Sequence, residues 1–333
     1  MGWARTRKDS MSQYVIGVDI GGTKIAAGIV DEKGGIVAKT VVSTLAEEGF
    51  ETSLEQVYKS VEELKASGKA GWEEIKGIGV CAPGPLDPFK GVVHNPPNLP
   101  GWREVPLAEL VSEKFDKPVR LENDANAAGM AEVKWGAAKG YKHVFYVTVS
   151  TGIGTAVIID GKIYHGKNGM AGEGGHVTIN YDAKDAVCNC GNTGCVETLA
   201  SGPGTVRRLL AKLKNAPDEK KAMILAAGEK DDARVTMITV GKAAANGNKT
   251  ALEAINEEAK LLGIWLGSMI SVLDPEIIVI GGGVSMLGEL LLATVRKTIP
   301  AYTINTRADK TPVVQAKLKN DVGIFGAAAV SPK

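Results

Sequence analysis

The sequence predicts an α/β protein with two similar domains, on the basis of its length, its composition and a repeated strand pattern. With 333 residues, the chain exceeds the size at which one hydrophobic core stops growing, so two domains are expected. Its 41 glycines and its aromatic content of 5% are typical of α/β enzymes that contain many tight turns. Two strand-turn-strand units, separated by about 130 residues, each contain a turn of Gly and Thr, which indicates a duplicated fold.

The first and smaller domain is expected over residues 14–122. The segment YVIGVD predicts a strand that ends at the glycine turn GGTK, and two further strand-like stretches follow, joined at Gly34-Gly35. Apolar residues at helical spacing predict a helix over residues 53–67, and IKGIGVCAPGP after it has the pattern of a buried strand. A final helix of small residues is expected from residue 321, and residues 321–333 are expected to return to this domain.

The second and larger domain is expected over residues 123–320. PVRLENDANAA predicts a short strand and then a helix that begins near Asn123 or Asp124, because Asn and Asp cap helices. HVFYVTVSTGIGTAVIIDGKIYHG predicts a second meander with glycine turns. Helices are expected from about residue 197 to 245 and from 250 to 272. EIIVIGGGVS then predicts a strand, a glycine turn and a helix start, and PVVQAKL predicts a last strand.

The balance of charge disfavours several classes of function. Lys and Arg number 39, Asp and Glu number 38, and they are interspersed, so no surface for a nucleic acid or an acidic membrane is indicated. No run of about 18 apolar residues is present, and the basic N-terminus lacks the apolar core of a signal peptide. These features favour a soluble, cytoplasmic protein. Residues 1–13 are expected to be a disordered tail or an expression remnant without function.

Three glycine turns that follow strands are the candidates for nucleotide binding. In DIGGTK, backbone N–H groups can face a phosphate, Lys24 adds a positive charge and Asp19 can reach a hydrated Mg²⁺. Alone, this hexapeptide is equally compatible with an ordinary hairpin turn. STGIG and IGGGVS add two turns of the same kind, and the three together predict a nucleotide site that is neither a Walker A loop nor a dinucleotide fingerprint. The candidate contacts are Asp19, Gly21, Gly22, Thr23, Lys24, Thr151, Gly152, Gly154, Gly282 and Gly283.

The segment ENDANAA carries a candidate catalytic base. A carboxylate at a helix N-terminus is stabilised in its ionised form, yet it can accept a proton from a hydroxyl group that attacks phosphorus. Asp124 is the candidate, and Asn123 beside it can hydrogen-bond a polyol. For an isolated Asn-Asp pair, a plain helix cap would be the commoner explanation. Asn98, in a loop rich in Pro, Gly and Asn, is a further candidate for substrate binding.

Three of the four cysteines lie within CNCGNTGC, downstream of the loop AGEGGH. His176, Cys188, Cys190 and Cys195 form a Cys₃His set, which is the composition of a closed structural zinc site. A disulfide or a chance cluster is the alternative, disfavoured by the expected cytoplasmic location. The zinc ion would tie the loop that contains Glu173 and His176 to the helix that contains Glu197.

DIGGTK, ENDANAA, STGIG, GMAGEGGH, CNCGNTGCVE and IGGGVS occur in the order and spacing of the ROK family (repressor, open reading frame, kinase), which the chain resembles from about Val15 to Val330. The resemblance implies two ribonuclease H-like domains flanking a cleft, as in actin, Hsp70 and sugar kinases, with a zinc-stabilised loop in the larger one. It implies ATP and Mg²⁺ as cofactors and Asp124 as the catalytic base. It also implies structural Zn²⁺ on the Cys₃His set, and sugar binding by Asn123, Glu173, His176 and Glu197.

The resemblance is strongest to the family's glucokinases, on the segment PNLPGW and the intact Glu, His and Glu sugar set. Phosphorylation of fructose, mannose, allose, N-acetylmannosamine or N-acetylglucosamine is the alternative, because kinases for these sugars share nearly all these residues.

The family also contains sugar-sensing repressors, which carry a DNA-binding module of roughly 70 to 90 residues before the first glycine turn. Eighteen residues precede Asp19 here, which disfavours a regulator without catalysis. A zinc-ribbon nucleic-acid binder is disfavoured by the near-neutral charge. A homodimer or higher homo-oligomer is expected from the family.

Overall fold

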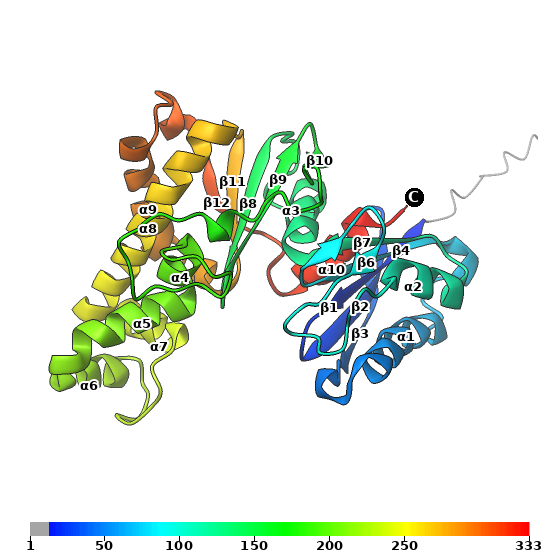
Figure 1. Cartoon of the computed structure of the whole chain (residues 1–333), viewed down its shortest axis with the longest axis horizontal. Helices are drawn as coiled ribbons and strands as arrows, with labels where there is room; N and C mark the ends of the chain where they lie inside the picture. Colours follow the sequence, from blue (N-terminus) through cyan, green and yellow to red (C-terminus); the bar gives the residue numbers. More distant parts are fainter. Residues whose placement is uncertain (1–12, 333) are drawn as a thin grey trace, which may run out of the picture. The chain divides into compact units, whose positions relative to one another are not determined.

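The computed structural model describes residues 13–332, which form two compact units (Figure 1). The first unit ends at Ala131 and resumes at Asn320, and the second runs from Glu132 to Lys319. The tail expected over residues 1–13 lies outside the described residues, apart from Gln13. Among the described residues, none of the helices has the combination of length and apolar character that a membrane span requires.

The first unit is built on a five-stranded sheet in which β1 is central. The strands, in sheet order, are β3 (Ile36–Ser43), β2 (Lys24–Asp31), β1 (Tyr14–Ile20), β4 (Ile75–Ala82) and β7 (Val119–Asn123). β1 pairs antiparallel with β2 and parallel with β4, and β4 pairs parallel with β7. Because parallel strands end at the same edge of a sheet, the segments that follow β1, β4 and β7 meet there. The register puts Cys81 opposite both Asp19 and Glu122.

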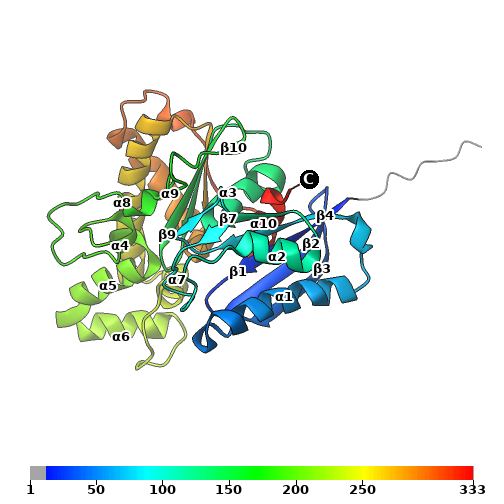
Figure 2. The same ribbon diagram turned by 45° about the vertical axis from the view of Figure 1, so that its right-hand side comes forward.

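Among the described residues, three α-helices lie wholly within this unit, and one of them comes from the C-terminal part of the chain. They are α1 (Phe50–Ala66), α2 (Leu107–Phe115) and α10 (Val322–Val330). In Figures 1 and 2 the red helix α10 lies beside the blue strand β1 and its neighbour β4. The helix approaches the strands closely, since a Cβ at Gly79 would lie 1.8 Å from the carbonyl oxygen of Ala327. Residues 322–330 therefore belong to the core of the first unit, although they are far from it in sequence.

The long segment between β4 and α2 is folded rather than a bare connector. It contains a small hairpin of β5 (Leu86–Asp87) and β6 (Val92–Val93), and Val93 also pairs with Val105. Trp102 is fully buried and packs edge-on against Phe50 of α1, with 5.5 Å between the ring centroids. This packing fixes the loop in which Asn98 lies.

The second unit repeats the topology of the first. Its strands, in sheet order, are β10 (Lys162–Ile163), β9 (Ile153–Ile159), β8 (Val144–Val149), β11 (Ile277–Gly281) and β12 (Val313–Gln315). β8 pairs antiparallel with β9 and parallel with β11, and β11 pairs parallel with β12. The sheet order and the strand senses match those of the first unit, so the duplication expected from the two meanders is confirmed as a repeat of topology.

The helical region of the second unit is more divided than the sequence predicts. It comprises α4 (Val196–Ala200), α5 (Gly202–Lys212), α6 (Pro217–Ala226), α7 (Met237–Ala245), α8 (Lys249–Leu273) and α9 (Glu289–Thr298). Ser201 accepts a hydrogen bond from the Gly204 N–H as the cap of α5, and Pro217 begins α6, which explains two of the breaks. The helix expected directly after the triple glycine is instead a 3₁₀ segment, Gly283–Leu287. Gly288, with φ at +57°, separates it from α9.

The division between the units falls within α3 (Asp124–Trp135), after Ala131, whereas the sequence predicted a boundary at residue 122. The beginning of α3 packs closely on α10, since a Cβ at Gly326 would lie 2.8 Å from the Ala127 carbonyl carbon. From Glu132 onward the contacts belong to the second unit. The buried Glu132 carboxylate accepts hydrogen bonds from the backbone N–H groups of Lys317 and Leu318, at 2.9 to 3.1 Å.

The core of the second unit contains one acid that lacks such partners. Glu258 lies on α8, its side chain is fully buried, and no described backbone N–H group donates to either carboxylate oxygen. Burial raises the pKa of Glu258 to about 8, against the opposing effects of the Arg208 guanidinium and of the Thr205 side chain. Glu258 is therefore mainly protonated in the folded protein at neutral pH.

We predict that this acid makes the folded state less stable as pH rises. The folded-state pKa lies above the unfolded one, so the folded protein binds more protons, and stability falls between about pH 4.5 and pH 8. The contribution of Glu258 to the change in the free energy of unfolding approaches about 1.4 kcal/mol per pH unit. In Glu258→Gln, stability should fall less steeply with pH, and the melting temperature at pH 8 should be higher than that of the wild type. Thermal unfolding from pH 5 to 8 measures both. An unchanged slope would show that Glu258 does not titrate in this range.

Candidate functional site

The turn between β1 and β2 is closed by its own backbone and held by a neighbouring threonine. The Gly21 N–H donates to the Lys24 carbonyl oxygen at 3.0 Å, and the Thr44 hydroxyl donates to the Gly21 carbonyl at 2.6 Å. A Cβ at Gly22 would lie 2.8 Å from the Asn98 carbonyl oxygen, so the turn lies directly against the loop that contains Asn98. Thr23 and Lys24 are exposed. The turn therefore offers a rigid backbone with its polar groups accessible, as phosphate binding requires.

Asp19, at the end of β1, is held from two sides. The Cys81 thiol donates to Asp19 Oδ1 at 3.3 Å, and a Cβ at Gly323 of α10 would lie 1.9 Å from Oδ2. Burial raises the pKa of Asp19, whereas the hydrogen bond from Cys81 and the positive charge of Lys24 lower it. Cys81 is fully buried, and burial, followed by the negative charge of Asp19, raises the pKa of its thiol well above the usual value. Cys81 is thus a hydrogen-bond donor to a candidate site residue, a role that the apolar strand around it does not indicate.

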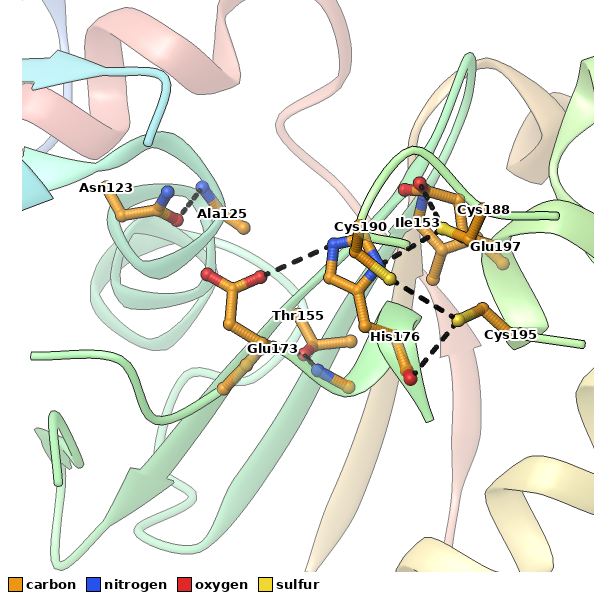
Figure 3. A network of polar contacts seen from close by, with 12 residues as sticks. Asn123, Ala125, Ile153, Thr155, Glu173, His176, Cys188, Cys190, Cys195 and Glu197 are labelled. Carbon is orange, nitrogen blue, oxygen red and sulfur yellow. Dashed lines mark hydrogen bonds and ion pairs between the residues drawn. The ribbon is translucent and has the colours of Figure 1, made fainter. Parts of the chain in front are cut away.

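Asn123 caps helix α3, and Asp124 is the first residue of the helix. The Asn123 Oδ1 atom accepts hydrogen bonds from the N–H groups of Ala125 at 2.9 Å and Asn126 at 3.3 Å, the first of which is drawn in Figure 3. The buried Glu122 supports this cap, because its Oε1 atom accepts hydrogen bonds from Asn123 N and Asn126 Nδ2, both at 3.1 Å. Asp124 itself is exposed, and its Oδ1 atom accepts from the Ala125 N–H at 2.7 Å. Asn123 and Asp124 therefore share the capping hydrogen bonds, and the Asp124 side chain is exposed at the helix N-terminus.

In the second unit, two of the predicted glycine turns lie side by side. They follow β8 and β11, which are parallel neighbours, so both turns emerge at the same edge of the sheet. A Cβ at Gly282 would lie 2.3 Å from the Val149 carbonyl oxygen. The Ser150 N–H donates to the Gly152 carbonyl at 2.9 Å, which closes the first turn. The structure thus brings Thr151, Gly152 and Gly154 together with Gly282 and Gly283.

The loop that contains Glu173 and His176 is fastened to β9 by Thr155. The Thr155 hydroxyl donates to the Gly172 carbonyl and accepts from the Gly174 N–H, the latter at 3.0 Å (Figure 3). The loop then forms a single 3₁₀ turn, Gly174–His176. Glu173 is exposed, and its Oε2 atom lies 4.0 Å from His176 Nε2. Two hydrogen-bonding side chains are thereby presented next to each other, which suits recognition of adjacent hydroxyl groups.

His176, Cys188, Cys190 and Cys195 converge, as Figure 3 shows, and their ligand atoms all lie within 4.8 Å of one another. His176 Nδ1 is 3.5 Å from Cys188 Sγ, and the sulfur atoms of Cys190 and Cys195 are 3.7 Å apart. A tetrahedral zinc ion with Zn–S bonds of about 2.3 Å and Zn–N bonds of about 2.0 Å separates its ligand atoms by about 3.5 to 3.8 Å. The cluster is therefore compatible with zinc. His176 turns Nδ1 to the thiols and Nε2 to Glu173.

The thiols themselves also fit a cation. Burial acts to raise the pKa of Cys188, but hydrogen bonds, led by that of the Cys190 backbone N–H, lower it to about 7. Burial, and then the hydrogen bonds and charges of the other two thiols, raise the pKa of Cys195 to about 12. Three sulfur atoms this close would repel one another as thiolates, and a divalent cation is the group that would stabilise all three in that form.

Glu197, on α4, contacts the turn after β8. Its Oε2 atom accepts a hydrogen bond from the Ile153 N–H at 2.8 Å, and its Oε1 atom lies 3.9 Å from Cys188 Sγ. The contact with Ile153 is drawn in Figure 3. The sequence predicted Glu197 as a sugar ligand only, and its link to a glycine turn depends on a long-range contact that the motif spacing does not contain.

The predicted residues thus form two groups, one in each unit. Asp19, the GGTK turn, Asn98, Asn123 and Asp124 belong to the first unit, and the other candidates belong to the second. Sequence reasoning missed the supporting residues Glu122, Thr155 and Cys81. Glu122 lies beside Asn123 in the strand VRLEN, and a carboxylate there requires hydrogen-bond partners once it is buried.

Comparison with known proteins identifies the family. The sequence profile of the ROK family matches residues 15–333. A glucokinase from Thermotoga maritima is 34% identical over 316 residues, covering 95% of this chain and 96% of its own. A xylose repressor from Caldicellulosiruptor bescii is 31% identical over 316 residues, covering 95% of this chain and 77% of its own. The crystal structure of a ROK family glucokinase from Streptomyces griseus in complex with glucose and AMPPNP has a TM-score of 0.80 and 33% identity, covering 96% of this chain and 99% of its own. The chain belongs to the ROK family, and its two-domain α/β fold is that of the family's sugar kinases.

We predict that Cys190→Ser releases zinc from the cluster. Serine is a poor zinc ligand, so the metal content after dialysis against a chelator should fall from about one ion per chain to below about 0.2. Cys81→Ser is the matched control, because Cys81 lies in the first unit and its replacement should leave zinc bound. Elemental analysis of the purified proteins gives the metal content. Full retention of zinc by Cys190→Ser would contradict the assignment of the cluster.

Proposed function

We propose that the protein is a glucokinase, which transfers the γ-phosphate of ATP to the 6-hydroxyl group of glucose. Its membership of the ROK family and its similarity to glucokinases over nearly the whole chain support sugar kinase activity. The observation that carries the proposal is the position of Asp124. Because Asn123 caps helix α3, the Asp124 carboxylate is exposed at the helix N-terminus, where it is accessible to a substrate hydroxyl group.

Asp124 acts as the general base in this proposal. Its carboxylate accepts the proton of the 6-hydroxyl group as that oxygen attacks the γ-phosphorus in line with the bond that breaks. Asn123, Glu173, His176 and Glu197 bind the other hydroxyl groups, and Asn98 contributes from the loop beside the GGTK turn. Each hydroxyl group held by a matched polar partner lowers the entropic cost of reaching the reactive geometry.

The glycine turns bind the phosphates of ATP. Backbone N–H groups of the turns after β1 and β8 donate to phosphate oxygens, and Lys24 offsets negative charge that develops in the transition state. The turn with Gly282 and Gly283, which lies against the end of β8, receives the nucleoside part. When bound, Mg²⁺ neutralises the phosphates, and Asp19 is the carboxylate that would hold it through water.

The Cys₃His cluster holds a structural zinc ion in this proposal. A site with four protein ligands has no vacant position for water or substrate, so it does not act on the sugar directly. Its effect is to fix the ring of His176. With Nδ1 on the metal, Nε2 faces Glu173 and is available to a sugar hydroxyl group.

A survey of sugars tests the activity. We expect ATP consumption to depend on an added hexose, and glucose to give a kcat/KM at least about tenfold above those of fructose, mannose, allose and the N-acetylhexosamines. A coupled assay of ADP release measures this. A preference for another sugar would replace glucose but keep the kinase. The similarity to a xylose repressor favours one second candidate, a sugar sensor, which would bind a sugar with no ATP turnover.

Replacement of the proposed base gives a second test. We expect Asp124→Asn to lower kcat by about 100- to 10 000-fold, because general base catalysis is lost while the shape of the site is kept. The melting temperature and the zinc content should not change. Asp218→Asn is the matched control, since Asp218 is an exposed acid in the first turn of α6. Turnover within about tenfold of the wild type would remove Asp124 from this role.

A further inference from the structure

The short helix α4 connects the metal cluster to a glycine turn. It begins directly after the cluster residue Cys195 and ends at Ala200. Two hydrogen bonds join it, and the residues that follow it, to the turn after β8. The Ile153 N–H donates to Glu197 Oε2 at 2.8 Å, and the Gly202 N–H donates to the Ser150 carbonyl oxygen at 2.9 Å. The turn is thus attached at both of its ends (Figure 3 shows the contact of Glu197 with Ile153).

The attachment at Ile153 is closely packed. A Cβ at Gly152 would lie 2.5 Å from Glu197 Oε2, so the carboxylate occupies the space that a side chain would fill. On the other side, a Cβ at Gly175 would lie 1.9 Å from the Ile153 carbonyl oxygen. Ile153 is therefore enclosed by α4 and by the loop that contains His176. A shift of either segment must displace the backbone of the turn.

The start of α4 is positioned by the cluster. Cys195 is fully buried, and its Sγ atom lies 3.7 Å from Cys190 Sγ and 3.4 Å from the His176 carbonyl oxygen. The Val196 N–H donates to the Val177 carbonyl at 2.9 Å, one residue after the ligand His176. Val196 and Ala200 are fully buried, so α4 has no solvent-facing side into which these residues could turn. The cluster thus fixes the start of the helix that holds the turn.

We propose that α4 makes nucleotide affinity depend on the metal cluster, with Glu197 as the positioning residue of the phosphate-binding turn. This rests on the proposed function, in which the turn formed by residues 150–154 binds the phosphates of ATP. Backbone N–H groups bind a phosphate well only if their directions are fixed beforehand, because ordering a loose turn costs conformational entropy at the moment of binding. Glu197 and the Gly202 N–H supply this order, and zinc fixes the helix that carries them. Loss of zinc should therefore weaken nucleotide binding even when no sugar is present.

Nucleotide binding in the absence of sugar tests the role of Glu197. We expect Glu197→Ala in the zinc-loaded protein to bind AMPPNP about tenfold more weakly than the wild type, measured by calorimetry, since one hydrogen bond to a charged acceptor is lost. Glu197→Gln keeps an acceptor oxygen for the Ile153 N–H and should stay within about threefold. Glu219→Ala is the matched control, because Glu219 is an exposed acid in the first turn of α6 and belongs to neither the proposed binding residues nor the cluster. It should bind AMPPNP as the wild type does.

Hydrogen exchange at the Ile153 amide gives a readout that does not depend on the proposed function. We expect faster exchange at this amide in Glu197→Ala and in zinc-free wild type, and wild-type protection in Glu197→Gln. Zinc-free wild type should also lose about tenfold in AMPPNP affinity. Unchanged AMPPNP affinity and unchanged Ile153 protection in Glu197→Ala would overturn the inference, even if the zinc-free protein fails to fold. If the wild type binds no AMPPNP, the proposed function fails, while the exchange rates still decide whether α4 holds the turn.

Discussion

Parallel pairing of strands is the constraint on which both groups of candidate residues depend. Within a sheet, parallel strands must end at the same edge, so whatever follows them is collected there. In the first unit this edge receives the turn after β1, the loop after β4 and the start of α3 after β7. In the second unit it receives the turns after β8 and β11. Residues about a hundred positions apart become neighbours because their strands are neighbours, and the repeat of the topology produces the arrangement twice.

Hydrogen bonds from buried side chains then fix the segments that the strands deliver. Thr44 holds the turn after β1, Glu122 supports the cap of α3, and Thr155 holds the loop with Glu173. These groups are satisfied by backbone or amide partners, so their burial costs little and their geometry is specific. Glu258 is the contrast, since it is buried without such partners and its pKa rises to about 8. The difference distinguishes Glu122, which supports the candidate site, from Glu258, which lies in the core of the second unit.

The Cys₃His cluster has wider consequences than its four residues suggest. Metal binding would order His176 on one side and, through Cys195, the start of α4 on the other. Through Glu197 and Gly202 the same helix reaches the turn after β8. A single ion can therefore support both the proposed sugar-binding loop and the proposed phosphate-binding turn. Three of the four cysteines of the chain lie within the eight residues that the proposed ion would hold together.

The sequence by itself determined the α/β class, the two meanders, most strands, a helix that begins near Asn123 or Asp124 and the four residues of the candidate metal cluster. These features depend on local periodicity, on turn chemistry, or on ligands close together along the chain. Only the tertiary structure decided the boundary inside α3, the division of the helical region, and the contacts of Cys81 with Asp19 and of Glu197 with Ile153. Each of these depends on packing between segments that are distant in sequence. Spacing and composition carry no record of which backbone N–H or which carboxylate will meet a given side chain once the sheets have formed.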